Sequence, residues 1–147
     1  MALAIDIVAG GKAKSASETL LALSYLERAR DTGRSLGFSS FGLMETDERK
    51  LAAAVVSPFV VALDERGKSF TSEGFARDLA KWRDAGESRL VFAIGGSDGL
   101  PADVKRQARL TMAFGTQTWP HLLVRTMLAE QLYRAVTILG GHPYHRT

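Results

Sequence analysis

Three short segments contain the residues of this chain that are best suited to hold a small ligand. The first is LDERGK (63–68), the second is GGSDG (95–99), and the third covers residues 114–120. Glycine allows a backbone to approach a ligand closely and to adopt positive φ. None of the segments has the GxGxxG or GxxxxGK[ST] pattern of the common nucleotide-binding loops. From these residues alone, a small-ligand pocket and plain turns both remain open.

The C-terminal tail is the second concentration of chemically capable side chains. Two histidines, a tyrosine and an arginine (His142, Tyr144, His145 and Arg146) follow Gly140 and Gly141. Aromatic rings stack on RNA bases and arginine pairs with phosphates, so the tail favours an RNA contact. The two histidines could also ligate a metal. No third histidine or carboxylate stands near them in the sequence, which disfavours a metal site.

The charge of the chain is unevenly distributed. The 19 basic and 16 acidic residues give a net charge of +3. Residues 101–147 contain six basic and two acidic residues, whereas residues 1–100 are close to neutral. A basic end on a neutral body indicates a polyanionic partner, although a solvated face with chance asymmetry explains it equally well.

Length and composition exclude several classes of protein. The 147 residues predict a single domain, residues 1–147. The chain has no cysteine, which excludes disulfides, thiolate metal sites and thiol catalysis. Its apolar runs are shorter than the ~18 residues that a membrane span needs. Asp6 interrupts the first apolar run, which therefore predicts a strand rather than a signal peptide. We expect a cytoplasmic protein without a membrane or metal partner.

Apolar runs and helical patterns alternate along the chain. The runs at 59–63 (FVVAL) and 89–94 (RLVFAI) are typical of buried parallel strands. Alternating strands and helices predict a three-layer α/β fold with a mainly parallel sheet. The expected strands are 3–8, 36–44, 59–63, 89–94 and 109–114. The expected helices are 17–33, 46–58, 72–86, a short one at 101, and 120–139.

The last expected helix, 120–139, has an apolar arc wider than the stripe of about 100° that a surface helix needs. Burial within one chain or a dimer interface could cover it. Glu130 and Arg134 stand four positions apart, which is the spacing of a surface ion pair. The alternative role for Arg134 is a contact with a phosphate.

Five motifs in a fixed order resemble one enzyme family. They are LDERGK (63–68), IGGSDGL (94–100), TWPH (118–121), EQLYRA (130–135) and HPYHR (142–146). In this order and spacing they resemble the bacterial large-subunit ribosomal RNA pseudouridine N3-methyltransferases of the SPOUT superfamily. The resemblance covers almost the whole chain and is densest from residue 59 onward.

The resemblance implies a C-terminal trefoil knot, an S-adenosylmethionine site inside the knot, and a homodimer that methylates N3 of a pseudouridine in 23S rRNA, on assembled ribosomes. General rules of topology disfavour knots, so this expectation rests on the resemblance alone. Two residues depart from the family pattern: Gln117 replaces a hydrophobic residue and Trp119 replaces a leucine. The cofactor contacts carried over from the family are Leu63, Gly95, Phe114, Gly115, Thr116, Gln117, Thr118 and Trp119.

Methylation at a ring nitrogen requires that the nitrogen lose its proton to a base or to water. The candidates are His145 and Tyr144 in the tail, with His121 as a third group that could equally have a capping role or contact RNA. Arg134 and Arg146 would contact RNA. Two other functions remain open: a dimeric RNA-binding module without catalysis, and a monomeric nucleotide-binding domain of flavodoxin type.

Overall fold

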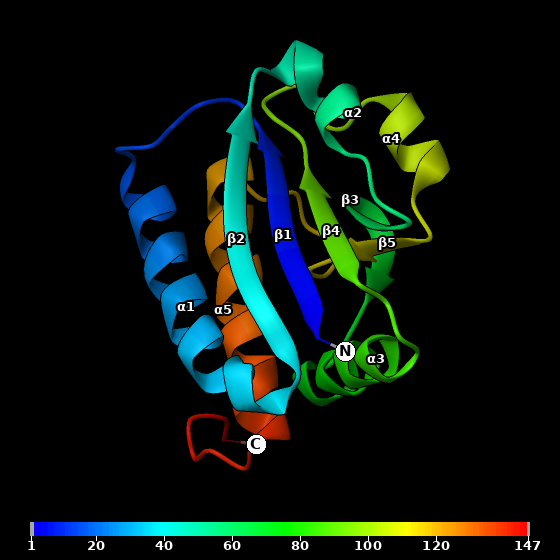
Figure 1. Ribbon diagram of the computed structural model, residues 1–147. Helices are drawn as coiled ribbons and strands as arrows, with labels where there is room; N and C mark the ends of the chain where they lie inside the picture. Colours follow the sequence, from blue (N-terminus) through cyan, green and yellow to red (C-terminus); the bar gives the residue numbers. More distant parts are fainter. Residues whose placement is uncertain (1, 147) are drawn as a thin grey trace.

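The computed structural model describes residues 2–146, and Met1 and Thr147 lie outside the described part. Five strands form one sheet in the order β2-β1-β4-β3-β5, and every neighbouring pair is parallel. Helices cover both faces, so the predicted three-layer α/β fold is confirmed (Figure 1). The strands are β1 (Leu3–Gly10), β2 (Phe38–Thr46), β3 (Phe59–Ser69), β4 (Arg89–Ile94) and β5 (Leu110–Ala113).

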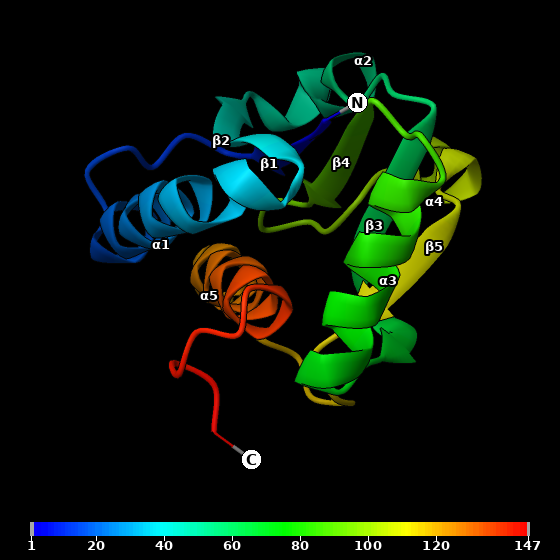
Figure 2. The ribbon, with the colours of Figure 1, turned by 60° about the horizontal axis from the view of Figure 1, so that its bottom comes forward.

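Three long helices lie on one face of the sheet and two short ones on the other, as Figure 2 shows. The long helices are α1 (Ser17–Gly33), α3 (Ser72–Asp84) and α5 (His121–Leu139). The short helices are α2 (Leu51–Ala54) and α4 (Ala102–Gln107). Each predicted helix is present, although the one expected at 46–58 is much shorter.

Alternation along the central strands explains why both faces are covered. In β4, Leu90 and Phe92 belong to the core on the side of the long helices, whereas Val91 and Ala93 belong to the core under the short helices. Side chains of a strand point alternately to opposite faces. A run without polar residues therefore needs a helix layer on each side.

The region between β2 and β3 differs from its prediction. β2 continues to Thr46, and only a 3-10 turn (Glu48–Lys50) and α2 follow it. The side chain of Asp47 accepts a hydrogen bond from the amide of Arg49 at 2.9 Å and caps this turn. Val55 and Val56 then lead to Pro58, which limits how far a helix can continue.

β3 is longer than predicted because it contains a bulge. Leu63 and Lys68 both pair with Met112 of β5, so the four residues between them leave the ladder. A Cβ atom at Gly67 would lie only 2.6 Å from the carbonyl carbon of Thr111. Glycine is therefore the residue that permits the bulge to close against β5, and the bulge carries the LDERGK side chains out of the sheet.

Candidate functional site

The three glycine-containing and aromatic loops meet in one cavity of about 520 Å³ at the carboxyl edge of the sheet. The first is the bulge within β3, and the other two follow β4 and β5; these three parallel strands are neighbours in the sheet. This is the edge where ligands bind in open α/β sheets. The volume lies in the range of small-molecule sites. The cavity is lined by Leu63–Arg66, Ile94–Leu100, Lys105, Met112–Phe114, Gln117–His121 and Val124.

Six of the eight residues carried over as cofactor contacts line this cavity: Leu63, Gly95, Phe114, Gln117, Thr118 and Trp119. Gly115 instead lines a smaller cavity of about 210 Å³, on the side of α3. Thr116 lines neither cavity. Their backbone still belongs to the loop that forms one wall.

Two further lining residues, Lys105 and Met112, carry no signal in the sequence that marks them as part of a site. Lys105 lies on α4 and Met112 on β5. Only the packing of these elements brings them to the cavity.

Hydrogen bonds tie the loops to one another. The indole Nε1 of Trp119 donates to the backbone oxygen of Phe114 at 2.8 Å, which closes the 114–119 loop on itself. The hydroxyl of Thr118 donates to the carboxylate of Glu65, joining this loop to the bulge after Leu63. Trp119, the larger residue at a position where the family has leucine, thus stabilises the loop as well as lining the cavity.

Close contacts at Gly95 and Gly96 and the backbone conformation of Gly99 explain the glycines of the second loop. A Cβ at Gly95 would lie 2.3 Å from the carbonyl carbon of Gly99, and one at Gly96 would overlap the carboxylate of Glu48. Gly99 has a φ of +79°, a conformation that favours glycine. A side chain at position 95 therefore displaces this loop before it meets any ligand.

An ion pair lies in the wall of the cavity. Lys105 Nζ is 2.8 Å from Oδ2 of Asp64, and the amide of Arg66 donates to Oδ1 at 2.9 Å. The hydrogen bonds from Lys105 and from the backbone amide of Arg66 lower the pKa of the Asp64 carboxyl below its ordinary value of 3.8. Asp64 is therefore a carboxylate at neutral pH, suited to accept hydrogen bonds from hydroxyl or ammonium groups.

The structure places His121 at the cavity and the tail away from it. His121 is the first residue of α5 and lines the cavity. The tail packs beside Glu130 and Arg134 farther along α5, and Arg134 is about 20 Å along the helix axis from His121. In Figure 1 the tail lies below the lower end of α5, whereas β1 and β2 end at the top. Within one chain, Tyr144 and His145 are therefore distant from the cavity.

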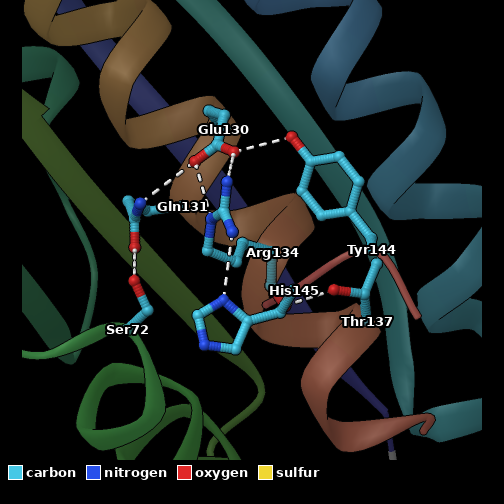
Figure 3. Close-up of polar contacts among 7 residues, drawn as sticks. All are labelled: Ser72, Glu130, Gln131, Arg134, Thr137, Tyr144 and His145. Atoms are coloured by element: carbon cyan, nitrogen blue, oxygen red, sulfur yellow. Dashed lines mark hydrogen bonds and ion pairs between the residues drawn. The ribbon is translucent and has the colours of Figure 1, made fainter. Parts of the chain in front are cut away.

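The tail is held on α5 by a polar network (Figure 3). Glu130 accepts hydrogen bonds from the Tyr144 hydroxyl at 2.7 Å and from Nη2 of Arg134 at 2.6 Å. Nη1 of Arg134 contacts Nδ1 of His145 at 3.0 Å. Gln131 donates to Glu130 and accepts from Ser72 of α3 at 2.8 Å. This order contrasts with the frayed end that is usual for a terminus.

Apolar contacts reinforce this network. The ring of Tyr144 lies 4.6 Å from that of Tyr133, and the Arg134 guanidinium is 4.8 Å from the centre of the Tyr144 ring. Burial and the hydrogen bond to Glu130 raise the pKa of the Tyr144 phenol well above its ordinary value. Tyr144 is therefore uncharged at physiological pH.

Most of the basic side chains of residues 101–147 form ion pairs within the protein. Arg134 pairs with Glu130, as its spacing predicted, and Arg106 pairs with Asp103. Three further cations pair with acids from the first hundred residues: Lys105 with Asp64, Arg109 with Glu87, and Arg125 with Glu45. Only Arg146 forms no ion pair within residues 2–146. The positive surface inferred from the charge distribution along the sequence is thus largely neutralised by folding.

The wide apolar arc of α5 is covered within the monomer. Leu128, Leu132 and Val136 are fully buried, and α5 lies between α1 and α3. Of the two ways of covering this arc that the sequence left open, the structure shows burial within one chain, so the arc itself does not require a second chain. The large apolar side chains that stay exposed on this side are Leu20, Leu21 and Leu23 of α1, with Leu123 of α5 and Trp119 before it.

No helix within residues 2–146 combines the length and hydrophobicity that crossing a bilayer requires. Within the same residues, no three histidine, aspartate or glutamate side chains are grouped so that they could hold a metal ion.

Comparison with known proteins identifies the family of this chain. A family model described as "Predicted SPOUT methyltransferase" matches residues 3–145. Two curated relatives are both named "Ribosomal RNA large subunit methyltransferase H". The relative from Bradyrhizobium diazoefficiens is 45% identical over 97% of this chain and 98% of its own. The relative from Caulobacter vibrioides is 48% identical over 97% of each chain.

Solved structures agree on the fold. A probable methylase family protein from Haemophilus influenzae superimposes with a TM-score of 0.53 at 9% identity, covering 99% of this chain and 70% of its own. A probable methyltransferase from Bordetella pertussis gives a TM-score of 0.52 at 11% identity, covering 90% and 93%. With the family match along nearly its whole length, the chain belongs to the SPOUT methyltransferases.

Proposed function

We propose that this protein transfers a methyl group from S-adenosylmethionine to N3 of a pseudouridine in 23S rRNA, acting on assembled ribosomes in the cytoplasm. The observation that carries the proposal is the convergence of the three motif loops on one cavity at the carboxyl edge of the sheet. Membership of the SPOUT methyltransferases and near-full-length relatives named as large-subunit rRNA methyltransferases support the reaction and the substrate class. Because the chain belongs to this family, a methyltransferase replaces the alternative of a flavodoxin-type nucleotide-binding domain.

The residues of the cavity fit a ligand with an apolar aromatic part and polar ends. Leu63, Ile94 and Met112 provide an apolar surface. The carboxylates of Asp64 and Glu65 could accept from ribose hydroxyls or from an ammonium group. The turn at Gly95–Gly99 is so compact that a Cβ at Gly95 would meet its backbone, and its residues line the cavity.

The bound cofactor would supply an activated methyl group, and the protein would position the acceptor and manage the proton of N3. His121 is the one proposed proton acceptor that lines the cavity of its own chain. Tyr144 and His145 could act only at the cavity of a second chain. The hydrogen bond from Arg134 occupies Nδ1 of His145, so His145 becomes a base only when this bond is broken.

We therefore also propose a homodimer in which the tail of one chain completes the cavity of the other. The exposed leucines of α1 and Leu123 at the start of α5 support an apolar interface on this side. In this arrangement Arg134 and Arg146 would approach RNA at the partner's cavity. The trefoil knot remains a prediction from the family.

The proposal is tested by methyl transfer from labelled cofactor to ribosomes of a strain that lacks this modification, followed by mapping of the modified base. We expect label at one pseudouridine of 23S rRNA. Calorimetry with S-adenosylmethionine separates an enzyme from an RNA-binding module without catalysis. Absence of both binding and transfer would contradict the proposal.

A further inference from the structure

The strongest unexplained feature outside the cavity is a fully buried arginine on α5. Arg125 is 0% exposed and forms an ion pair with Glu45 at the end of β2. Its Nη2 donates to the backbone oxygens of Gly11 at 2.7 Å and Gly10 at 3.3 Å, at the end of β1. A buried ion pair is rarely the most stable solution for a core, because both charges lose their hydration. This arrangement therefore calls for an explanation beyond stability.

The two charges hold both ends of the turn between β1 and α1. Arg125 binds the carbonyls at its start, and Oε2 of Glu45 accepts from the amide of Ala13 at 2.8 Å. The amide of Gly11, whose φ is +93°, also donates to the oxygen of Thr46 at 2.8 Å. Burial opposes ionisation of Glu45, but the bonds from Ala13 and Arg125 outweigh it and lower its pKa. The turn is thus held by two elements, α5 through Arg125 and β2 through Glu45 and Thr46.

This fixed turn presents two lysines to solvent. Lys12 and Lys14 are exposed, and neither forms an ion pair with an acid of residues 2–146. Glu45, whose carboxylate interacts electrostatically with Lys14, is already paired with Arg125. These charges therefore remain available, whereas five of the six cations of residues 101–147 are paired.

The turn also stands next to the cavity. It begins at the carboxyl end of β1, and β1 is paired with β4, whose following loop lines the cavity. A Cβ at Gly10 would lie 3.1 Å from the amide nitrogen of Gly96 in that loop. The turn is therefore close enough to contact a polyanion that places one residue in the cavity.

We propose that the turn of residues 11–14, held by Arg125 and Glu45, is a phosphate-binding surface on which Lys12 and Lys14 contact the RNA backbone beside the modified residue. The inference rests on the proposed function, since it names how the same site holds its substrate. Lysine binds phosphate as a point charge, and a preorganised turn loses little entropy when it binds. Each phosphate contact releases counterions, so it contributes to the salt dependence of binding.

The test is the double variant Lys12→Gln/Lys14→Gln, assayed for methyl transfer to unmodified ribosomes over a range of salt concentrations. We expect KM for ribosomes to rise about tenfold and the slope of log KM against log salt to fall by about 1.4 to 1.8. kcat and the affinity for S-adenosylmethionine should change less than twofold. Neither lysine packs in the core, so the fold should be retained.

The matched control is Arg30→Gln/Lys81→Gln. It removes the same charge from exposed residues in the last turns of α1 and α3, at the opposite edge of the sheet. An unchanged KM and salt slope in the lysine variant, or an equal effect in the control, would overturn the inference. Failure of the parent protein to methylate ribosomes would instead contradict the proposed function.

Discussion

Arg134 donates a hydrogen bond through Nη1 to Nδ1 of His145, with 3.0 Å between the two nitrogens. A guanidinium has no acceptor, so Nδ1 must supply the lone pair, and a neutral imidazole then carries its proton on Nε2. Nε2 points toward Glu73, 3.5 Å away. The network around Glu130 therefore determines the tautomer as well as the position of His145.

The tautomer of His145 is a first prediction. Nitrogen-15 NMR at a pH where His145 is neutral should show the Nε2-protonated form alone. In Arg134→Met the bond is lost and a mixture of tautomers should appear. His121, whose side chain forms no hydrogen bond within residues 2–146, provides an internal reference that the substitution should not alter. A tautomer mixture in the parent protein would contradict the arrangement.

Deletion of residues 144–147 should abolish methyl transfer but leave cofactor affinity within about twofold, because the cavity residues lie elsewhere in the fold. Thr147 is outside the described residues. Since Tyr144 packs on Tyr133 and donates to Glu130, the deletion should also reduce the free energy of unfolding by about 1–3 kcal/mol. Calorimetry, urea unfolding and the ribosome assay measure the three quantities. Methyl transfer at the parent rate would exclude a catalytic role for the tail.

Gly95→Val should abolish cofactor binding. The physical reason is that its Cβ would lie 2.3 Å from the carbonyl carbon of Gly99, so the loop must open and lose its shape. Calorimetry with S-adenosylmethionine measures the effect, and Gly140→Ala at the far end of α5 is a control with unchanged affinity. Binding by Gly95→Val at the parent affinity would mean that this loop does not form the site.

Mixing the variant that lacks residues 144–147 with Gly95→Val tests whether tail and cavity act from different chains. Neither homodimer should be active, but a mixed dimer joins the intact cavity of one chain to the intact tail of the other. If subunits exchange freely, about a quarter of the parent activity should return. Light scattering should show a dimer for each protein. A mixture without activity, or a monomer at micromolar concentration, would contradict the proposed dimeric site.

Glu45→Gln should destabilise the protein in a pH-dependent way. The pKa of Glu45 is lowered in the folded state, so its ionised form contributes stability that is fully present above its ordinary pKa of 4.5 and is lost as pH falls through the folded value. The difference in unfolding free energy between parent and variant should therefore be largest near neutral pH and shrink below pH 4.5. Urea unfolding across this range measures it. Asp103→Asn, which removes an exposed carboxylate, is the control. Thermal melting should show only a small loss of stability for it.

The sequence by itself determined the layers and the site loops. Uninterrupted apolar runs such as 90–94 require cover on both faces, which is a local property that favours a parallel α/β sheet. The loops at 63–68, 95–99 and 114–120 follow predicted strands, and parallel strands end at one edge, so their convergence followed from the fold class.

Only the tertiary structure decided which charges and apolar faces remain available. Arg109 and Glu87, or Arg125 and Glu45, are far apart in sequence, and no periodicity predicts that folding pairs them. The same holds for α5, whose arc is covered by α1 and α3. The tail sequence favoured an RNA contact, whereas the structure shows Glu130 and Tyr133 holding Tyr144 against α5. Pairing and packing depend on distances between elements, and these are set only when the whole chain has folded.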